Sequence, residues 1–359
     1  MFVAWRDLRF ARGRFVLIGS VVALITLLVG FLAGLTGGLA AQNVSAVLGL
    51  PGDRIVLQHS DSGQPSFSDS SIDSGAVEAW RSAPGVKDVL PVGIAQGKAT
   101  AHGKTAAVAF FGLPQGGAAS AVTDLAPRAA HEVGLSAGAA KDLGGAQVGD
   151  RVSILGGTYT VASVGDDAWY SHTPVVALTP DAWAHLSKAM GGTGEATALA
   201  VTGDPDWNAV ADRTHTIAQP PLLSLAALDA FKSEIGSLGL MIAMLFGISA
   251  LVVGAFFTVW TMQRSADIAV LKALGATTRS LVRDALGQAL VVLVVGIGVG
   301  MLVVVALGTL ASGALPFLLS PLTTLAPAVA MAVLGLLGAA VALRNVTKSD
   351  PLTALGSNR

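Results

Sequence analysis

The segment GKATAHGKT (97–105) is the nearest approach to a phosphate-binding loop in this sequence. Such a loop, G-x-x-x-x-G-K-[ST], surrounds nucleotide phosphates with backbone N–H groups and one lysine. Gly103, Lys104 and Thr105 match the end of the motif, but Gly97 stands one position too early and position 98 is a lysine. The segment also lies between two runs that read as strands. We therefore predict that this chain has no ATP site of its own.

The six histidines show no spacing that is typical of a metal site. They are His59, His102, His131, His172, His185 and His215. None forms the pair four residues apart, within a carboxylate motif, that binds zinc on a helix. The sequence also contains no Cys and no G-x-S-x-G motif, which excludes thiolate chemistry and gives no indication of a serine hydrolase. We expect no catalytic residues, no metal site and no intrinsic cofactor.

Three long intervals without charged residues show where the main elements of this chain lie. Charged residues make up 13% of the 359 residues, about half the share in a soluble domain. Asp, Glu, Lys and Arg are all absent from 15–52, 235–263 and 285–343. Because about 20 apolar residues cross the hydrocarbon core of a bilayer, the first two intervals each hold one span and the third holds two. The prolines of ALPFLLSPLTTLAP mark the turn in the third interval.

These intervals predict an integral membrane protein with four transmembrane helices. We place the spans at 16–41, 234–262, 286–312 and 323–343. A cleaved signal peptide is the alternative for the first span, but its apolar stretch is usually only about 7–15 residues long. A buried core helix is the alternative for the others, and such a helix rarely runs so far without a charge.

The distribution of Lys and Arg predicts the orientation of the spans. The first 14 residues, the segment 263–284 and the tail 344–359 together carry a net charge of +7, whereas 42–234 carries −8. Because loops rich in Lys and Arg stay in the cytoplasm, both termini and the short segment are predicted to be cytoplasmic. The segment 42–233 is then extracytoplasmic, in a multi-pass protein of the bacterial plasma membrane.

The extracytoplasmic segment has the pattern of an α+β domain. Short apolar runs alternate with turn residues and with short helical patterns. Strands are predicted at 54–58, 89–95, 106–113, 151–156, 158–165, 174–179 and 196–203, and helices at 74–82, 136–143, 181–190 and 206–213. Gly156 and Gly157 are expected to form a hairpin turn, and the Ser- and Asp-rich stretch 60–75 a loop. A helix at 223–234 is expected to continue into the second span.

The cytoplasmic segment MQRSADIAVLKALGATTRSLVRDALGQAL (262–290) contains an Arg, then an acidic residue and a spaced apolar pattern that ends in Gly-Ala. The positions are Arg264, Asp267, Ile268, Leu271, Lys272, Leu274, Gly275 and Ala276. This pattern resembles the signature region of the MacB/FtsX-like ABC-transporter permeases. It departs from the family at two positions, where Asp267 replaces the commoner Glu and Gln288 stands where a Glu often begins the third span. Further segments that resemble the family are 4–15, 149–165 and 350–356.

The resemblance implies a non-catalytic permease subunit of an ABC-type efflux system, in which a separate ATPase hydrolyses ATP-Mg. It implies a homodimer of this chain with two ATPase copies, contacts with membrane lipid and none with nucleic acid. The ATPase-coupling residues would be Arg264, Asp267, Ile268, Leu271, Lys272, Leu274 and Gly275. Ile268, Leu271 and Leu274 form an apolar stripe at helical spacing, which fits docking into a groove on the ATPase. A helix lying on anionic headgroups is the alternative.

The same resemblance assigns the parts around the membrane. The cytoplasmic parts would be an amphipathic helix at 1–15, a coupling loop and helix at 263–285 and the tail at 344–359. Small residues are expected where the spans pack closely, or are simply tolerated there. The candidates are Gly30, Gly34, Gly37, Gly38, Gly296, Gly298 and Gly300.

The size of the chain and its start, RDLRFARGRF, resemble the HrtB/DevC-type branch of the family, which implies haem as the leading substrate. Haem needs an axial ligand, and the first span contains no His, Met, Tyr or Cys. The candidate haem-binding residues are Glu234, Met241, Met244, Tyr170 and His172. Glu234 would lie at the outer mouth of the second span, where a carboxylate is costly unless it has a role. A simple interfacial charge is the alternative for Glu234.

Two other functions fit the same cytoplasmic pattern. An ABC permease of this kind can export a lipid, a peptide or an antibiotic. An FtsX-like transmembrane signal transmitter controls a cell-wall hydrolase and moves no cargo. Stimulation of ATP hydrolysis by the cargo would separate transport from signal transmission.

Overall fold

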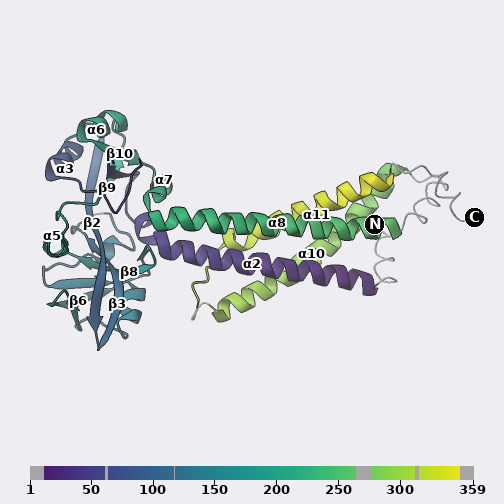
Figure 1. The fold of residues 1–359 in the computed structure, drawn as a ribbon, viewed down its shortest axis with the longest axis horizontal. Helices are drawn as coiled ribbons and strands as arrows, with labels where there is room; N and C mark the ends of the chain where they lie inside the picture. The colour runs from purple at the N-terminus through teal and green to yellow at the C-terminus, as the bar shows by residue number, and fades with distance from the viewer. Residues whose placement is uncertain (1–11, 61–63, 117, 264–276, 312–314, 348–359) are drawn as a thin grey trace, which may run out of the picture. The chain divides into compact units, whose positions relative to one another are not determined.

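The computed structural model describes residues 12–60, 64–116, 118–263, 277–311 and 315–347. They form two compact units. The outer unit is Leu39–Gly236, and the helical unit consists of the described residues before 39 and after 236. Helices α2 (Arg12–Leu48) and α8 (Asp229–Gln263) each contribute residues to both units (Figure 1).

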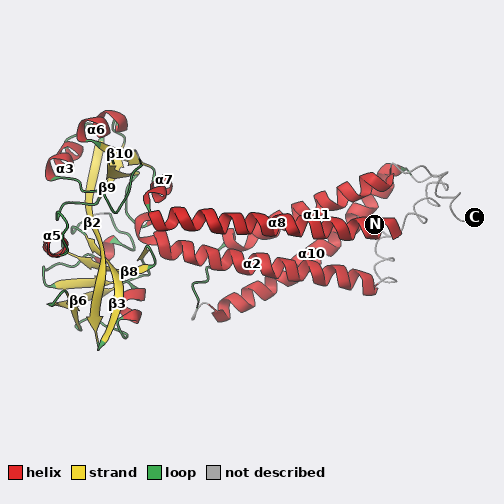
Figure 2. Cartoon of the chain, viewed as in Figure 1, coloured by secondary structure: helices red, strands yellow, loops and turns green. Residues whose placement is uncertain are grey.

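The helical unit is built from long apolar helices. Besides parts of α2 and α8 it contains α10 (Thr278–Ala311) and α11 (Pro321–Thr347), as Figure 2 shows. Among the described residues, four segments are long and apolar enough to cross a membrane: Phe15–Leu48, Asp229–Phe256, Arg279–Ala311 and Pro321–Val341. These segments correspond to the four predicted spans. Helix α10 begins at Thr278, before the predicted start of the third span at 286, so the part of the predicted coupling segment from 278 to 285 is helical.

Glycines allow α2 and α10 to pack closely. A side-chain carbon at Gly296 would lie 2.8 Å from the Val22 side chain, and one at Gly300 would lie 2.6 Å from the Ala23 carbonyl oxygen. Four further glycines also have a neighbour closer than a Cβ allows: Gly30 lies against Val304, Gly34 against Phe317, Gly37 against Thr323 and Gly38 against Pro316. Only Gly298, of the seven predicted glycines, has nothing within 4 Å of its Cβ position among the described residues. Close approach therefore accounts for six of the seven.

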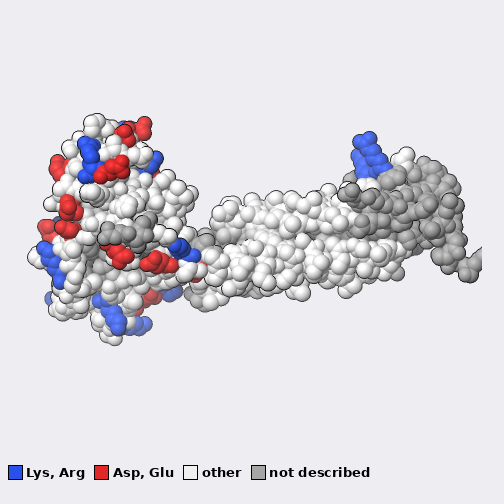
Figure 3. Space-filling view, turned by 45° about the horizontal axis from the view of Figure 1, so that its top comes forward, with Lys and Arg blue, Asp and Glu red and all other residues white. Residues whose placement is uncertain are grey.

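The outward surface of the helical unit is apolar. Leu251 on α8, Leu302 on α10 and Leu322 on α11 are each more than 70% exposed. Figure 3 shows this unit as largely white, whereas charged side chains cover the outer unit. Large side chains of this kind are stable on a surface when lipid rather than water covers them.

The outer unit contains a ten-stranded sheet with small helices. The strands are β1 (Arg54–Gln58), β2 (Val86–Ala101), β3 (Lys104–Gly112), β4 (Glu132–Leu135), β5 (Arg151–Ile154), β6 (Gly157–Val164), β7 (Trp169–Tyr170), β8 (Thr173–Leu178), β9 (Ala198–Gly203) and β10 (Thr216–Gln219). Their order is β10-β1-β9-β2-β3-β8-β4-β6-β5, and β7 pairs with β8. The helices are α3 (Ser74–Arg81), α4 (Ala137–Asp142), α5 (Pro180–Ala189), α6 (Trp207–Thr214) and α7 (Pro221–Ser224).

The long strand β2 joins two halves of the outer unit (Figure 1). Its residues 86–92 pair with β9, and its residues 93–101 pair with β3. Trp80 lies in the core of the first half and Phe110 in the core of the second, and both are fully buried. A third cluster, which includes Phe67 and Tyr170, contains residues of α2 as well.

Three sequence predictions for this unit need correction. The strands β4, β7 and β10 are missing from them, because runs of two to four residues give no clear period. The turn between β5 and β6 consists of Leu155 and Gly156, both with positive φ, rather than of Gly156 and Gly157. The predicted helix 223–234 is interrupted, since α7 and a 3-10 turn precede Leu228 and α8 begins only at Asp229.

Candidate functional site

A two-residue hairpin turn places the first candidate residues. Ser171 and His172 connect β7 to β8, and both have positive φ (46° and 63°), as the favoured two-residue turns of hairpins require. Their N–H groups donate to Asn43 O (2.9 Å) and to Gln42 O (3.0 Å) of α2. The Trp169 N–H donates to Ser45 Oγ at 3.0 Å. The hairpin is therefore fixed against the last turns of α2 within the outer unit.

His172 and Glu234 meet at this turn. His172 Nε2 lies 3.0 Å from Glu234 Oε2, and Asn43 Nδ2 donates to the same oxygen at 3.0 Å. Glu234 stands near the start of α8, so one carboxylate oxygen joins α2, α8 and the hairpin. The His172 side chain is 40% exposed and that of Glu234 is 18% exposed, whereas Asn43 is fully buried. We call these three residues the Glu234 cluster.

The cluster offers two groups that can bind a metal. A neutral imidazole nitrogen and a carboxylate oxygen are both metal ligands. In the cluster they bond to each other, so a metal ion at Nε2 has to replace this hydrogen bond. After that exchange the Glu234 carboxylate would still accept a hydrogen bond from Asn43 Nδ2.

Tyr170 lies next to His172 in sequence but has a different environment. It is 7% exposed, and its ring packs edge-on against Phe67 and Phe111, with ring centres 6.2 Å and 5.8 Å away. Burial raises the pKa of the Tyr170 phenol above its usual value, and the negative charge of Asp229 raises it further. Tyr170 therefore keeps its proton at neutral pH and is part of the core.

The remaining predicted residues lie elsewhere. Met241 and Met244 are on α8 beyond Glu234, in the helical unit, and both side chains are more than half exposed. The proposed ATPase-coupling residues lie outside the described residues, as does most of the predicted 1–15 helix and of the tail. They are Arg264, Asp267, Ile268, Leu271, Lys272, Leu274 and Gly275.

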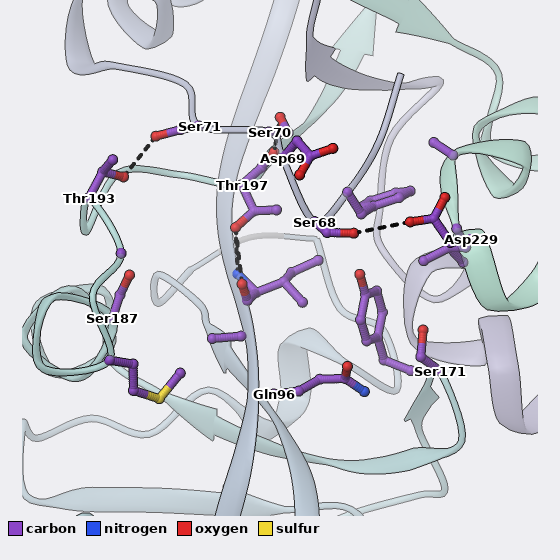
Figure 4. Close-up of a pocket in the computed structure, with 18 of the residues that line it drawn as sticks. Ser68, Asp69, Ser70, Ser71, Gln96, Ser171, Ser187, Thr193, Thr197 and Asp229 are labelled. Carbon is purple, nitrogen blue, oxygen red and sulfur yellow. Dashed lines mark hydrogen bonds between the residues drawn. The ribbon is translucent and has the colours of Figure 1, made fainter. Parts of the chain in front are cut away.

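The outer unit also contains a cavity of about 700 Å³ that the sequence predictions missed. One wall is formed by 67–71, which lies inside the stretch predicted only as a loop. The other walls come from the middle of β2, from Tyr170 and Ser171 of the hairpin, from α5, from 190–197 and from 227–230. Figure 4 shows that hydroxyl and carboxylate groups of several of these segments surround the space. The density of Ser and Asp in 66–73 was the signal available in the sequence.

The comparison with known families is decisive for the class of protein. The model of the MacB-like periplasmic core domain matches residues 16–217, and that of the FtsX-like permease C-terminal region matches residues 239–351. The chain belongs to the MacB/FtsX-type permeases. It is an ABC transporter permease and a multi-pass membrane protein with an extracytoplasmic segment, and this confirms the predicted fold class and family. A permease of this class works with an ABC ATPase.

Individual relatives are similar over their full length. The putative hemin transport system permease protein HrtB of Staphylococcus haemolyticus is 26% identical to this permease over 99% of both chains. An uncharacterized ABC transporter permease of Mycobacterium bovis, Mb2592, is also 26% identical over 99% of both chains. The extracellular domain of the ABC-type transporter YknZ from Gram-positive bacteria is a similar solved structure, with 14% identity and a TM-score of 0.34. That match covers 46% of this chain and 98% of the YknZ domain.

Proposed function

We propose that this permease belongs to an efflux system that removes haem from the membrane and uses ATP hydrolysed by a separate ATPase. The observation that carries the proposal is the pairing of His172 with Glu234 near the start of α8, the helix whose later residues form the second span. Two full-length staphylococcal relatives, 26% and 23% identical, are named as putative hemin transport permeases, which supports haem as the substrate.

The Glu234 cluster has the chemistry to hold a haem. Imidazole is a common axial ligand of haem iron. We assign that role to His172, because its side chain is the most exposed of the cluster. Glu234 then acts as a positioning residue: when its carboxylate accepts from Nε2–H of His172, the ring is held in place and Nδ1 is the nitrogen that would bind the iron. Asn43 holds the carboxylate throughout.

The other candidates have lesser roles in this proposal. We assign no ligand role to Tyr170, because its ring is packed in the core and burial raises its pKa, which disfavours the phenolate that binds iron. Met241 and Met244 offer exposed thioether groups further along α8, and we propose that they contact the substrate after it has left His172 or before it arrives.

The test is a haemin titration of the full-length permease in detergent, followed by absorbance at the Soret band. Wild type should give a saturable shift. Glu234→Ala should weaken binding about 10-fold, the usual effect of losing a group that orients a ligand. His172→Ala should weaken it more, because the ligand itself is lost. His185→Ala removes an exposed histidine of α5 and is the matched control.

Each outcome of this titration decides something. Without a saturable Soret shift in wild type, haem is not the substrate. If His172→Ala binds haemin like wild type, the cluster is the wrong site, whatever His185→Ala does. Haem-stimulated ATP hydrolysis by the permease with its ATPase separates transport from signal transmission, because a signal transmitter gives no such stimulation.

We also propose that 264–275 docks on the ATPase. Leu271→Glu introduces a charge into the apolar stripe and should abolish copurification with the ATPase, while insertion into the membrane is unchanged. If the segment is helical, as its spacing predicts, Ala273→Glu places the same charge on the opposite face and is the control. Loss of copurification in both variants, or in neither, contradicts docking through the stripe.

The proposed assembly contains two permease chains and two ATPase subunits. Native mass spectrometry of the purified complex gives this ratio directly. A complex with a single permease chain would contradict the homodimer.

A further inference from the structure

The cavity of the outer unit has an acidic lining. Three carboxylates line it: Asp69, Glu195 and Asp229. Lys, Arg and His are all absent from the described residues that line it. With no basic group in the lining to offset them, the three carboxylates favour positively charged occupants.

Hydroxyl groups make up much of the remaining polar lining. Ser71 Oγ lies 2.7 Å from Thr193 Oγ1 and donates to Glu195 Oε2 at 2.9 Å, and Ser68 Oγ lies 3.4 Å from Asp229 Oδ2. Figure 4 shows Ser71, Thr193 and Ser187 on one side of the space and Ser68 with Asp229 on the other. Hydroxyl groups donate and accept, so this lining can bond both to ammonium groups and to the hydroxyl groups of a ligand.

Aromatic and sulfur side chains complete the cavity. The indole of Trp183 packs over Gly93 and Gly112, where a Cβ would collide with the ring. Trp183 Nε1 is buried and has no hydrogen-bond partner among the described residues. Phe67 and Met190 add apolar surface. A volume of about 700 Å³ lies within the range of small-molecule sites, so the cavity is large enough for a molecule of drug size.

We propose that this cavity is a second binding site, which takes a polyhydroxylated organic molecule with several ammonium groups. The carboxylates on its separate walls would pair with the ammonium groups, and the serine and threonine hydroxyls with the hydroxyl groups of the ligand. Haem does not fit this description, because its propionates would meet three carboxylates. A bare metal ion does not fit either, since no group of three His, Cys, Asp or Glu among the described residues is arranged to hold one.

The site is connected to α8. Asp229 and Ala230 are the first residues of this helix and also line the cavity. A ligand that pairs with Asp229 therefore holds the start of α8 against the segment 67–71. None of the three residues of the Glu234 cluster lines the cavity, although Ser171, the neighbour of His172 in the hairpin turn, does.

The test uses kanamycin, which has several ammonium and hydroxyl groups, as the probe. Isothermal titration calorimetry of the full-length permease in detergent should show saturable binding, and the variants then locate it. The variant Asp69→Asn/Glu195→Gln/Asp229→Asn should weaken binding about 10-fold or more, since charge-assisted hydrogen bonds are lost. The control Glu78→Gln/Asp142→Asn/Asp212→Asn removes the same charge from exposed positions outside the cavity and should bind like wild type.

Fully N-acetylated kanamycin and calcium chloride are the comparison ligands. The acetylated compound keeps the hydroxyl groups but has no ammonium charge, so it should not bind. The proposal is overturned if the acetylated compound binds equally well, if both triple variants weaken binding alike, or if calcium binds at the same carboxylates. Haemin should not compete with kanamycin. A failed kanamycin titration leaves the haem proposal standing, and a failed haemin titration leaves the kanamycin site standing.

Discussion

The helical unit and the outer unit place their large apolar side chains in opposite ways. On α10, Leu302 is 72% exposed, whereas on β3 of the outer unit Phe110 is fully buried. The outer unit carries its charges on the surface, and the predicted spans contain only one charged residue, Glu234, the first residue of the second span. The difference shows that the two units are built for different solvents, lipid for one and water for the other. Four predictions test this contrast, from the largest expected effect to the smallest.

Trp80→Ala should cause the largest loss of stability. The side chain is fully buried in the first half of the outer unit, and its Nε1–H donates to Thr216 Oγ1 at 3.2 Å. Truncation should lower the free energy of unfolding of the outer unit by about 3–5 kcal/mol. Urea titration of the full chain in detergent, followed by fluorescence, measures this. Leu155→Ala, at an exposed hairpin turn, should change it by less than about 0.5 kcal/mol.

Leu302→Arg tests which solvent surrounds α10. An arginine near the middle of a span costs about 2.5–3.5 kcal/mol of insertion free energy. Val148→Arg makes a comparable change at a 65% exposed position of the outer unit and should be nearly neutral. The amount of membrane-inserted chain, measured by protease protection, should fall only for Leu302→Arg. Equal amounts for both variants would contradict lipid exposure of α10.

Asn43→Ala tests whether the Glu234 cluster stabilises the outer unit. The variant removes the amide that donates to Glu234 Oε2 at 3.0 Å. Because the partly buried carboxylate then loses its amide donor, stability should fall by about 1–3 kcal/mol. The same urea titration reports the change. An unchanged midpoint would mean that solvent replaces the amide without cost.

Tyr170→Phe should have the smallest effect, and only in alkaline solution. The folded-state pKa of Tyr170 lies above its unfolded value, so the folded chain keeps a proton that the unfolded chain loses. The stability of the outer unit should therefore fall as the pH rises above about 10, and Tyr170→Phe should reduce that fall. Tyr159→Phe, on β6, should keep the wild-type dependence on pH. If wild type and Tyr170→Phe lose stability equally as the pH rises, the raised pKa of Tyr170 is wrong.

The sequence predicted the long helices well, because apolar residues dominate their whole length. Charge-free intervals located the long helices because hydrocarbon tolerates so few charged side chains. The pattern around Arg264 to Ala276 indicated the family, which the family models confirm. The short strands β4, β7 and β10 were missed, because their pairing partners rather than their own residues stabilise them.

The candidate sites show where sequence reasoning stops. Glu234 and His172 were each named from the sequence, but nothing in it placed them on one oxygen with Asn43, which lies 191 positions from Glu234. The cavity was missed altogether, since Asp69, Glu195 and Asp229 come from three distant segments.

What the sequence determined by itself was the set of elements that depend on composition over a window: the spans, their orientation and the α+β character of the outer unit. Tertiary structure alone decided that Tyr170 is a core residue while His172, two positions later, is accessible. Tyr170 ends β7, whereas His172 lies in the positive-φ turn that reverses the chain between β7 and β8. It also decided that carboxylates far apart in sequence share one cavity. The physical reason is that hydrophobic burial acts on local composition, whereas a site depends on which distant segments the sheet brings together.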